Sequence, residues 1–322
     1  MKIRVTADST CDLSPELRAS YGITVAPLTV MLGDEAFHDG VNVTPNDIIT
    51  AVETGKTCKT AAVNVYEYEE LFRRMLDDCD AVIHLCIGKK FSVCYDNACQ
   101  AAEQCGNVYV VNSGNLTVGL GMMALDAVEM ARGGKQPQEI VQALESERNL
   151  IDTSFLLDQV EYLRNGGRCS SVAAVGAKLL QIKPSIEVEN GAMGVGKKYR
   201  GSFARSLEHY IKDKLEEQEQ IDRSRVILAH SPCDPGIVEQ AKAYLASAAN
   251  FQETYVCAAG STICCHCGPN TLGIIFKRKH PRFEYKRPDA AASGSACRKS
   301  GFHHFFEKAP SANQRSSEGV RN

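Results

Sequence analysis

The stretch YLRNGGRCSS, residues 162–171, carries the most informative local pattern in this chain. Its paired glycines, Gly166 and Gly167, tolerate positive φ and are typical of the position just past the end of a helix. The small apolar run at 172–180 favours a second helix after them. The stretch therefore predicts a bend between two helices that holds one cation, Arg168. A surface arginine at an ordinary helix corner accounts for the same spacing equally well.

The length and composition of the chain indicate an ordinary globular protein. With 322 residues, 44% of them hydrophobic and 23% charged, the chain is long enough for two domains. Its net charge of −3 argues against a basic surface for nucleic acid. No apolar run is long enough to span a membrane, and the N-terminus lacks the apolar region of a signal peptide. We therefore expect a cytoplasmic protein that binds no nucleic acid.

Segments with strand-like and helix-like patterns alternate along the chain. Strands are expected at residues 3–7, 23–32, 81–87, 107–111, 225–229, 254–258 and 272–276, with helices between most of them. The pair Asn190-Gly191 is a strong hairpin signal, whereas 56–63 has no clear period and is expected to be a loop. The alternation predicts an α/β fold with mostly parallel sheets. We expect an N-terminal α/β domain at 1–152, a C-terminal α/β domain at 153–279 and a disordered tail at 280–322.

The 14 cysteines of the chain are numerous for a cytosolic protein, and a reducing cytosol argues against disulfides among them. Their densest cluster is Cys264-Cys265-His266-Cys267. If this run is a strand, neighbouring side chains point to opposite faces and rarely close a tetrahedral metal site. We therefore expect no metal, and a metal-binding regulator is the least favoured of the alternatives.

Small polar side chains follow several of the expected strands, and in open α/β sheets ligands bind beyond the carboxyl ends of the strands. Ser9, Ser92 and Ser113 each follow an expected strand of the first half. Thr60 lies in the expected loop, and His266 comes from the second half. If they converge, these hydroxyls and the imidazole suit a carboxylate or another small oxyanion. For any single serine, capping a helix is the more frequent role.

The sequence lacks the motifs of several enzyme classes. It contains neither the Gly-x-Ser-x-Gly elbow of a serine hydrolase nor a Gly-x-x-x-x-Gly-Lys-Ser/Thr phosphate loop. Gly119-x-Gly121 lacks the third glycine of a dinucleotide-binding motif and lies inside an expected helix. No catalytic residue is assigned, which favours a binding protein. A free-standing enzyme that acts on a small oxyanion or carboxylate through Ser92 and His266 is the alternative.

Five short segments match, in order, the pattern of a known family. They are Asp8-Ser9, Lys59-Thr60, Ser92 followed by Tyr95, Tyr162-Leu163-x-x-Gly166-Gly167-Arg168, and His266-x-Gly268-Pro269-x-Thr271-Leu272-Gly273. Together they resemble the bacterial DegV family of fatty-acid-binding proteins, which supply the B subunit of fatty acid kinase. The resemblance covers residues 2–278, and its Gly-Gly-Arg and His-x-Gly-Pro motifs are the most specific.

The resemblance implies two α/β domains with one long acyl chain bound in the cleft between them. It also implies a lipid carrier that is not itself an enzyme, since a separate ATP-dependent kinase subunit would phosphorylate the carboxylate. By motif position, Thr60, Ser92 and His266 would bind the head group of the lipid. Arg168 and Arg200 would serve the acyl phosphate or the kinase partner.

Further expectations follow from the same resemblance. Ser9 and Ser113 are additional candidates for the head-group site, and the apolar runs 120–125 and 172–180 are candidate walls for the acyl chain. The fatty acid itself is the ligand, so no cofactor and no metal are expected. A carrier of this kind would contact membranes transiently.

This chain departs from the family pattern around the expected head-group site. Residues 61–64 read Ala-Ala-Val-Asn where the family usually has Ser-Gln-Pro-Ser, and Val93-Cys94 replaces Gly-Thr after Ser92. Asn112-Ser113 stands in place of Asp-Ser. Because valine lacks the backbone freedom of glycine, we expect altered loop geometry beside the head group.

Overall fold

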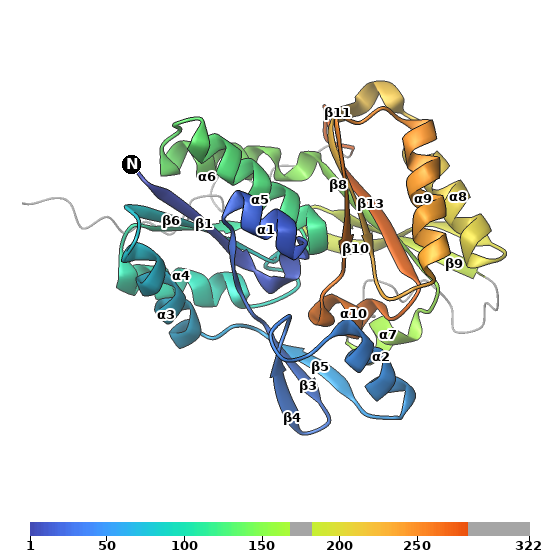
Figure 1. The fold of residues 1–322 in the computed structure, drawn as a ribbon, viewed down its shortest axis with the longest axis horizontal. Coiled ribbons are helices and arrows are strands. Elements are labelled where there is room, and N and C mark those ends of the chain that lie inside the picture. Colours follow the sequence, from blue (N-terminus) through green and yellow to red (C-terminus); the bar gives the residue numbers. More distant parts are fainter. Residues whose placement is uncertain (168–181, 283–322) are drawn as a thin grey trace, which may run out of the picture. The chain divides into compact units, whose positions relative to one another are not determined.

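The first half of the chain builds a four-stranded parallel sheet with the strand order β2-β1-β6-β7 (Figure 1). The computed structural model describes residues 1–167 and 182–282. The strands of this sheet are β1 (Ile3–Asp8), β2 (Thr24–Ala26), β6 (Ala81–Cys86) and β7 (Val108–Asn112). All residues of β6 are buried, as is typical of a parallel strand that is covered on both faces. The parallel sheet expected for this half is confirmed.

Five helices accompany this sheet: α1 (Pro15–Tyr21), α3 (Val65–Leu76), α4 (Cys94–Cys105), α5 (Thr117–Arg132) and α6 (Pro137–Glu147). Their starts follow from local sequence. Asn64 and Glu67 form a capping box at the start of α3, and Ser14 caps α1 ahead of Pro15. None of the helices in the described ranges is long and apolar enough to cross a membrane.

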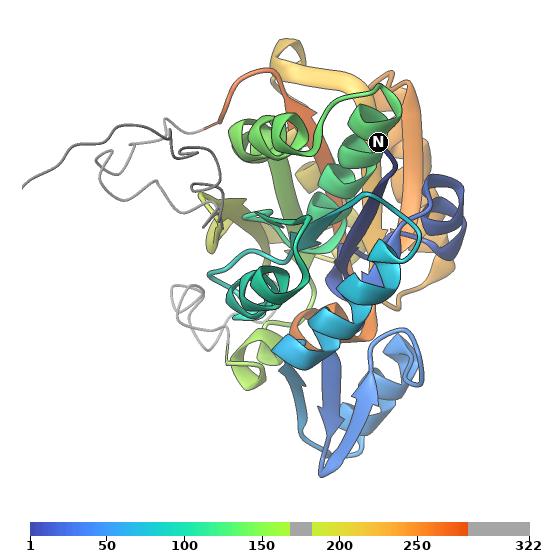
Figure 2. The same cartoon turned by 90° about the vertical axis from the view of Figure 1, so that its left-hand side faces the viewer.

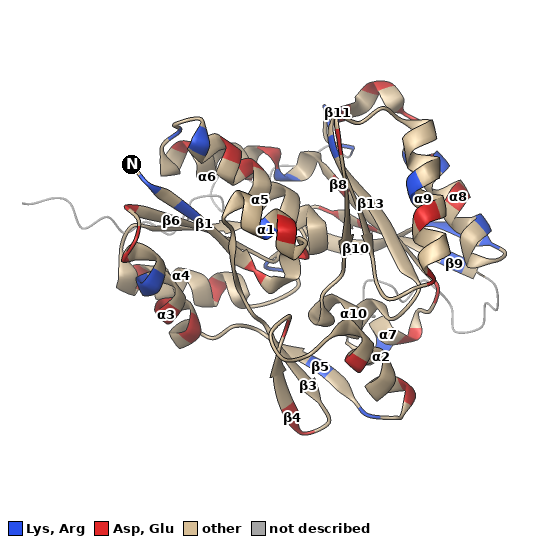
Figure 3. Cartoon of the chain, in the orientation of Figure 1, with Lys and Arg blue, Asp and Glu red and all other residues tan. Residues whose placement is uncertain are grey.

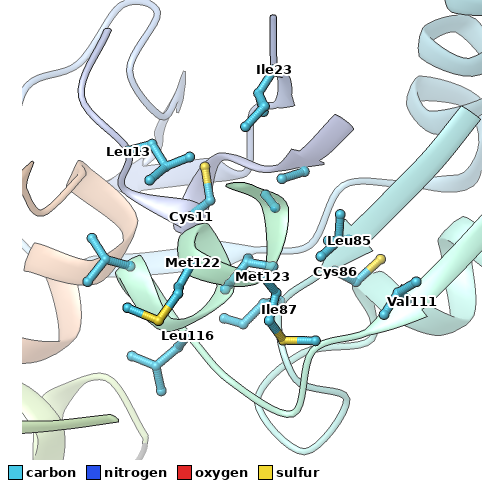
Figure 4. Close-up of a cluster of buried hydrophobic side chains, with 14 of the residues drawn as sticks. Cys11, Leu13, Ile23, Leu85, Cys86, Ile87, Val111, Leu116, Met122 and Met123 are labelled. Atoms are coloured by element: carbon cyan, nitrogen blue, oxygen red, sulfur yellow. The ribbon is translucent and has the colours of Figure 1, made fainter. Parts of the chain in front are cut away.

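Helix α5 is buried on nearly all sides. Figure 4 shows part of the cluster around it, where Met122 and Met123 lie among side chains that include Leu85 of β6, Val111 of β7 and Cys11 of the segment after β1. A Cβ atom on Gly121 would lie 2.5 Å from the backbone oxygen of Cys11. The glycine pair of α5 therefore allows close packing, and the run 120–125 belongs to the core and does not line the cavity described below.

The second half builds a six-stranded sheet with the order β10-β9-β8-β13-β11-β12. Its strands are β8 (Ile151–Leu157), β9 (Ile182–Glu189), β10 (Ala192–Arg200), β11 (Ile221–His230), β12 (Glu253–Ala258) and β13 (Thr271–Arg278). Among the described strands of this sheet, only β11 and β12 pair in parallel. The expectation of a mostly parallel sheet is wrong for this half, because β9 and β10 form a hairpin and β13 inserts antiparallel between β8 and β11.

The hairpin turn itself is where the sequence indicates it. Asn190 and Gly191 both have positive φ, at 49° and 74°, as a tight turn between two strands requires. Helices α8 (Phe203–Lys214) and α9 (Pro235–Ala248) pack on the second sheet through buried side chains that include Leu207, Tyr210 and Phe276. The α/β class of the fold is confirmed.

A small antiparallel sheet, β4-β3-β5, completes the described part of the chain. It consists of β3 (Thr29–Leu32), β4 (Glu35–His38) and β5 (Cys58–Ala61), so the loop expected at 56–63 is instead an edge strand paired with β3. Helices α2 (Pro45–Glu53), α7 (Glu161–Asn165) and α10 (Ser261–Cys267) lie nearby (Figure 2). α10 contacts α2, α7, β3 and β5, although it comes from the second half of the chain.

The expectation that the cysteines form no disulfide is wrong. The run 264–267 is helical, and Cys58 of β5 is joined by a disulfide to Cys265 of α10. The fold brings together two residues that are 207 positions apart, so their spacing in the sequence gives no sign of the bond.

Several expectations fall on residues outside the described ranges. These are the position of Arg168, the helix at 172–180 and all but the first three residues of the tail at 280–322. The expected boundary between 152 and 153 falls inside β8. The domain limits stay a prediction.

Candidate functional site

One cavity is lined by segments from both halves of the chain. Most of its wall is apolar, with Leu28, Ile87, Phe91, Leu116, Phe155, Leu163, Met193, Ile263 and Ile275 among the lining residues. The polar residues of the wall are Thr60, Ser92, Thr117, His230, Ser231, Thr262, His266 and Thr271. A largely apolar cavity with a few polar groups is typical of a site for a small apolar molecule with a polar end.

The three residues expected to bind a head group all line this cavity. Thr60 Oγ1 of β5 lies 2.9 Å from His266 Nε2 of α10, which joins the two halves of the chain by a hydrogen bond. Ser92 lies in the loop between β6 and α4, where its hydroxyl accepts from the Cys94 backbone N–H at 3.2 Å and lies 3.1 Å from Cys94 Sγ. Ser92 therefore both lines the cavity and supports the start of α4.

Two motif glycines, Gly166 and Gly268, lie in close packing contacts. A Cβ atom on Gly166 would collide with Nδ1 of His266, and a Cβ atom on Gly268 would collide with the ring of Tyr162. Both motifs that distinguish the sequence therefore belong to one interface between α7 and α10. The absence of a side chain at Gly166 lets the His266 imidazole lie where it contacts Thr60.

Two buried carboxylates hold the start of α10. Asp12 Oδ1 accepts from the Gly260 N–H at 2.9 Å, and Asp39 Oδ1 accepts from the Ser261 N–H at 2.8 Å. Ser9 donates to the second oxygen of Asp39 at 2.8 Å and is not among the residues that line the cavity. Helix α10, which contains no Lys, Arg, Asp or Glu (Figure 3), is therefore fixed at its start by acids of the first half.

Thr117, at the start of α5, links these carboxylates to the cavity wall. Its hydroxyl donates to Asp12 Oδ2 at 2.7 Å, and its φ of 47° is rare for a β-branched residue. The pKa of Asp12 is raised to about 7, mainly by burial and further by the charge of Asp39, while the hydrogen bonds from Thr117 and Gly260 oppose the rise. Backbone strain and a shifted pKa at one place are typical of a functional site.

The raised pKa of Asp12 predicts a pH dependence of stability. Between about pH 4 and pH 7 the folded protein keeps a proton on Asp12 that the unfolded chain has released. The contribution of this group to stability is therefore fully present below about pH 4 and lost as the pH rises through 7. The asparagine in Asp12→Asn cannot ionise, so this variant should lose less stability than the wild type as the pH rises from about 4 to about 7. The difference between their free energies of unfolding should change by up to about 1.4 kcal/mol per pH unit.

Urea unfolding of both proteins across this pH range measures the effect. The exposed Asp34→Asn is the matched control and should follow the wild type. Parallel curves for Asp12→Asn and the wild type would contradict the prediction.

The other candidate residues lie elsewhere. Ser113 is fully buried, and its hydroxyl bonds to the backbone of Asn115, so it shapes the loop before α5. Arg200 is exposed at the end of β10. Arg168 lies outside the described residues. Neither Ser113 nor Arg200 lines the cavity.

Among the described residues, one group of acids, histidines and cysteines lies close enough together to hold a metal ion: Asp8, His84 and Cys86. All three are buried, and Asp8 already accepts hydrogen bonds from Tyr68 Oη at 2.5 Å and the Ile87 N–H at 2.8 Å. Burial, with the charge of Asp8 adding to it, raises the pKa of the Cys86 thiol well above its usual value. This group is best described as a buried hydrogen-bond network.

The comparisons with known proteins give the family. A family model described as an uncharacterised protein of the DegV family matches residues 2–279. The chain therefore belongs to the DegV family. A DegV domain-containing protein of Deinococcus radiodurans is 30% identical over 285 residues, which cover 86% of this chain and 99% of that protein.

Solved structures of related proteins have the same fold. One is a DegV family protein from Thermus thermophilus whose structure is reported for its fatty acid binding. It is 28% identical to this chain, with a TM-score of 0.80, and the match covers 86% of this chain and 100% of that chain. The fatty acid kinase B3 protein of Streptococcus pneumoniae, solved with linoleic acid, is 17% identical with a TM-score of 0.74, covering 86% of this chain and 99% of that one. At this identity the second likeness shows the fold alone.

Proposed function

We propose that this chain binds one long-chain fatty acid in the cavity and presents its carboxylate to a separate ATP-dependent kinase subunit, which forms the acyl phosphate. The observation that carries the proposal is the meeting of Thr60 and His266, with Ser92, in the wall of an otherwise mainly apolar cavity. The fatty acid binding of the related Thermus thermophilus protein supports it. The kinase partner and the roles of Arg168 and Arg200 toward it rest on the family resemblance.

The chemistry of the cavity favours binding over catalysis. Each buried methylene group contributes about 0.8 kcal/mol, so walls such as Phe91, Leu116 and Phe155 supply most of the affinity. Two hydroxyls and an imidazole then orient the carboxylate by hydrogen bonds. A free-standing enzyme would need a base beside its nucleophile, whereas the Ser92 hydroxyl bonds to Cys94.

Native mass spectrometry of the protein purified from bacteria tests the proposal directly. A bound mass equal to that of a long-chain fatty acid is expected, and addition of a fatty acid kinase subunit with ATP should convert that lipid to its acyl phosphate. Protein that stays unliganded in the presence of fatty acids would refute the carrier. Bound lipid that no kinase subunit phosphorylates would refute the partnership alone.

Ser92→Ala is expected to weaken fatty acid binding by about 1–3 kcal/mol, because the buried carboxylate loses a hydrogen-bond donor. Titration of delipidated protein measures this affinity. Ser202→Ala is the matched control, since Ser202 also supports a helix start, at α8, but does not line the cavity. Equal affinities for the two variants would remove Ser92 from the site.

Gly166→Ala is expected to displace His266 and lower the fatty acid content of the purified protein. The added methyl group has no room beside the imidazole, and overpacking of this kind costs about 1–3 kcal/mol. Gly194→Ala in β10 is the control, because a Cβ atom added there would have no other atom within 4 Å and the φ of Gly194 is ordinary. A variant that keeps its full lipid content would show that the position of His266 does not determine binding.

A further inference from the structure

Helix α10 presents a second polar residue to the cavity besides His266. Thr262 lies four residues before His266, so the two side chains share one face of the helix, about 6 Å apart along its axis. Thr262 is 3% exposed, and its hydroxyl has no hydrogen-bond partner among the described residues. Buried hydroxyls are nearly always hydrogen-bonded, so this one points to a ligand group that the cavity receives.

His230, at the carboxyl end of β11, provides a complementary group. Its Nδ1 lies 3.0 Å from the backbone oxygen of Ser231, and because a carbonyl only accepts, Nδ1 carries the proton. In the neutral imidazole the other nitrogen, Nε2, is then an acceptor. No described residue bonds to Nε2, and His230 also lines the cavity.

The backbone brings these two groups to the same part of the wall. The N–H of Ala259, three residues before Thr262, donates to the backbone oxygen of His230 at 2.8 Å. The neighbouring hydroxyls each have a partner, since Ser231 Oγ accepts from the Thr271 N–H and Thr271 donates to the Cys267 oxygen. Thr262 Oγ1 has no partner among the described residues, and Thr262 and His230 therefore offer polar atoms to a ligand in this region.

We propose that Thr262 and His230 form a specificity site for a hydroxyl group carried on the acyl chain, so that the preferred ligands are hydroxylated fatty acids. The proposal rests on the proposed function. A hydroxyl can accept from Thr262 and donate to His230 Nε2 at once. An ionised carboxylate has no proton to give to Nε2, and an unsubstituted chain satisfies neither group. The spacing along α10 places the hydroxyl several carbons from the carboxylate held near His266.

Titration of full-length delipidated protein with stearate and a series of monohydroxystearates tests the proposal. We expect one positional isomer to bind about tenfold more tightly than stearate, the effect of one or two hydrogen bonds. Thr262→Val, which keeps the shape but lacks the hydroxyl, should bring the ratio of the two affinities close to one. Thr262→Ser should retain the preference, and His230→Leu should reduce it.

The ratio of the two affinities is measured within each variant, so partial loss of folded protein does not affect it. If the wild type binds stearate and all hydroxystearates equally, or if Thr262→Val keeps the preference, the inference is overturned and Thr262 bonds only to water. If no lipid of either kind binds, the proposed function fails as well.

Discussion

Removal of the Cys58–Cys265 disulfide is expected to lower the free energy of unfolding by about 2–5 kcal/mol. The bond closes a loop of 207 residues, and restriction of the unfolded chain grows with loop length. It also ties β5, which pairs with β3 alone, to α10. Thr60 follows Cys58 by two residues, and His266 follows Cys265 directly. Loss of the disulfide should therefore also loosen the contact between Thr60 and His266.

Guanidinium unfolding with and without a phosphine reductant measures the effect, and thiol titration verifies that the bond is broken. The double variant Cys58→Ser/Cys265→Ser should match the reduced wild type and should not respond to reductant. Cys105→Ser changes a half-buried free thiol and is the control. Identical unfolding midpoints for oxidised and fully reduced protein would contradict the prediction.

The second large effect is expected at Asp152, where Asp152→Asn should destabilise the fold by about 3–5 kcal/mol. Asp152 Oδ2 accepts from Arg278 Nε at 2.7 Å, and Oδ1 lies 3.3 Å from Lys214 Nζ. The side chains of all three residues are at most 6% exposed. Removing the carboxylate charge takes away the partner that these two buried cations share and leaves Lys214 with Glu187 and Arg278 with Glu217, which is costlier than losing a surface ion pair.

The same group gives a defined dependence on pH. Burial alone would raise the pKa of Asp152, but Lys214 and Arg278 outweigh burial and lower it below its usual value. Its stabilisation is therefore present above the pKa of the unfolded state and is lost as the pH falls through the lower folded-state value. The difference between Asp152→Asn and the wild type should shrink in strong acid.

A surface ion pair provides the comparison. Asp78 contacts Lys2 and Arg4, but these side chains are 41–60% exposed, so solvent screens the charges and Asp78→Asn should cost much less stability than Asp152→Asn. Urea unfolding at neutral pH compares the two variants. Similar losses for Asp78→Asn and Asp152→Asn would show that burial does not set the strength of the Asp152 cluster.

Local patterns in the sequence predicted much of the fold. The turn at Asn190-Gly191 and the buried strand β6 depend on neighbouring residues alone, and both are where the sequence indicated. Whether two strands pair in parallel or antiparallel is not determined by residues adjacent in the sequence. β8 is a continuous buried run of the kind found in parallel sheets, yet it pairs antiparallel with β9 and β13.

In the candidate site, too, some features could be predicted from local sequence and others depend on contacts between distant segments. Thr60, Ser92 and His266 could be selected because their motifs are recognisable, and the structure places them around one cavity, although their role toward a ligand stays a prediction. Thr262 and the disulfide could not be found in the sequence. Both depend on α10 packing against the small sheet, a contact between segments about 200 residues apart that no local pattern encodes.

The placement of α10 has a consequence for how this protein can be divided. The helix is encoded after residue 260, but its start is bonded to Asp12 and Asp39 and it is cross-linked to β5. A fragment that contains only the second half would expose the apolar faces of α10 and lack both acids. Expressed separately, the two halves would therefore have to reassociate to form the cavity, so that fragment complementation, and not excision of an autonomous lobe, is the appropriate way to dissect this chain.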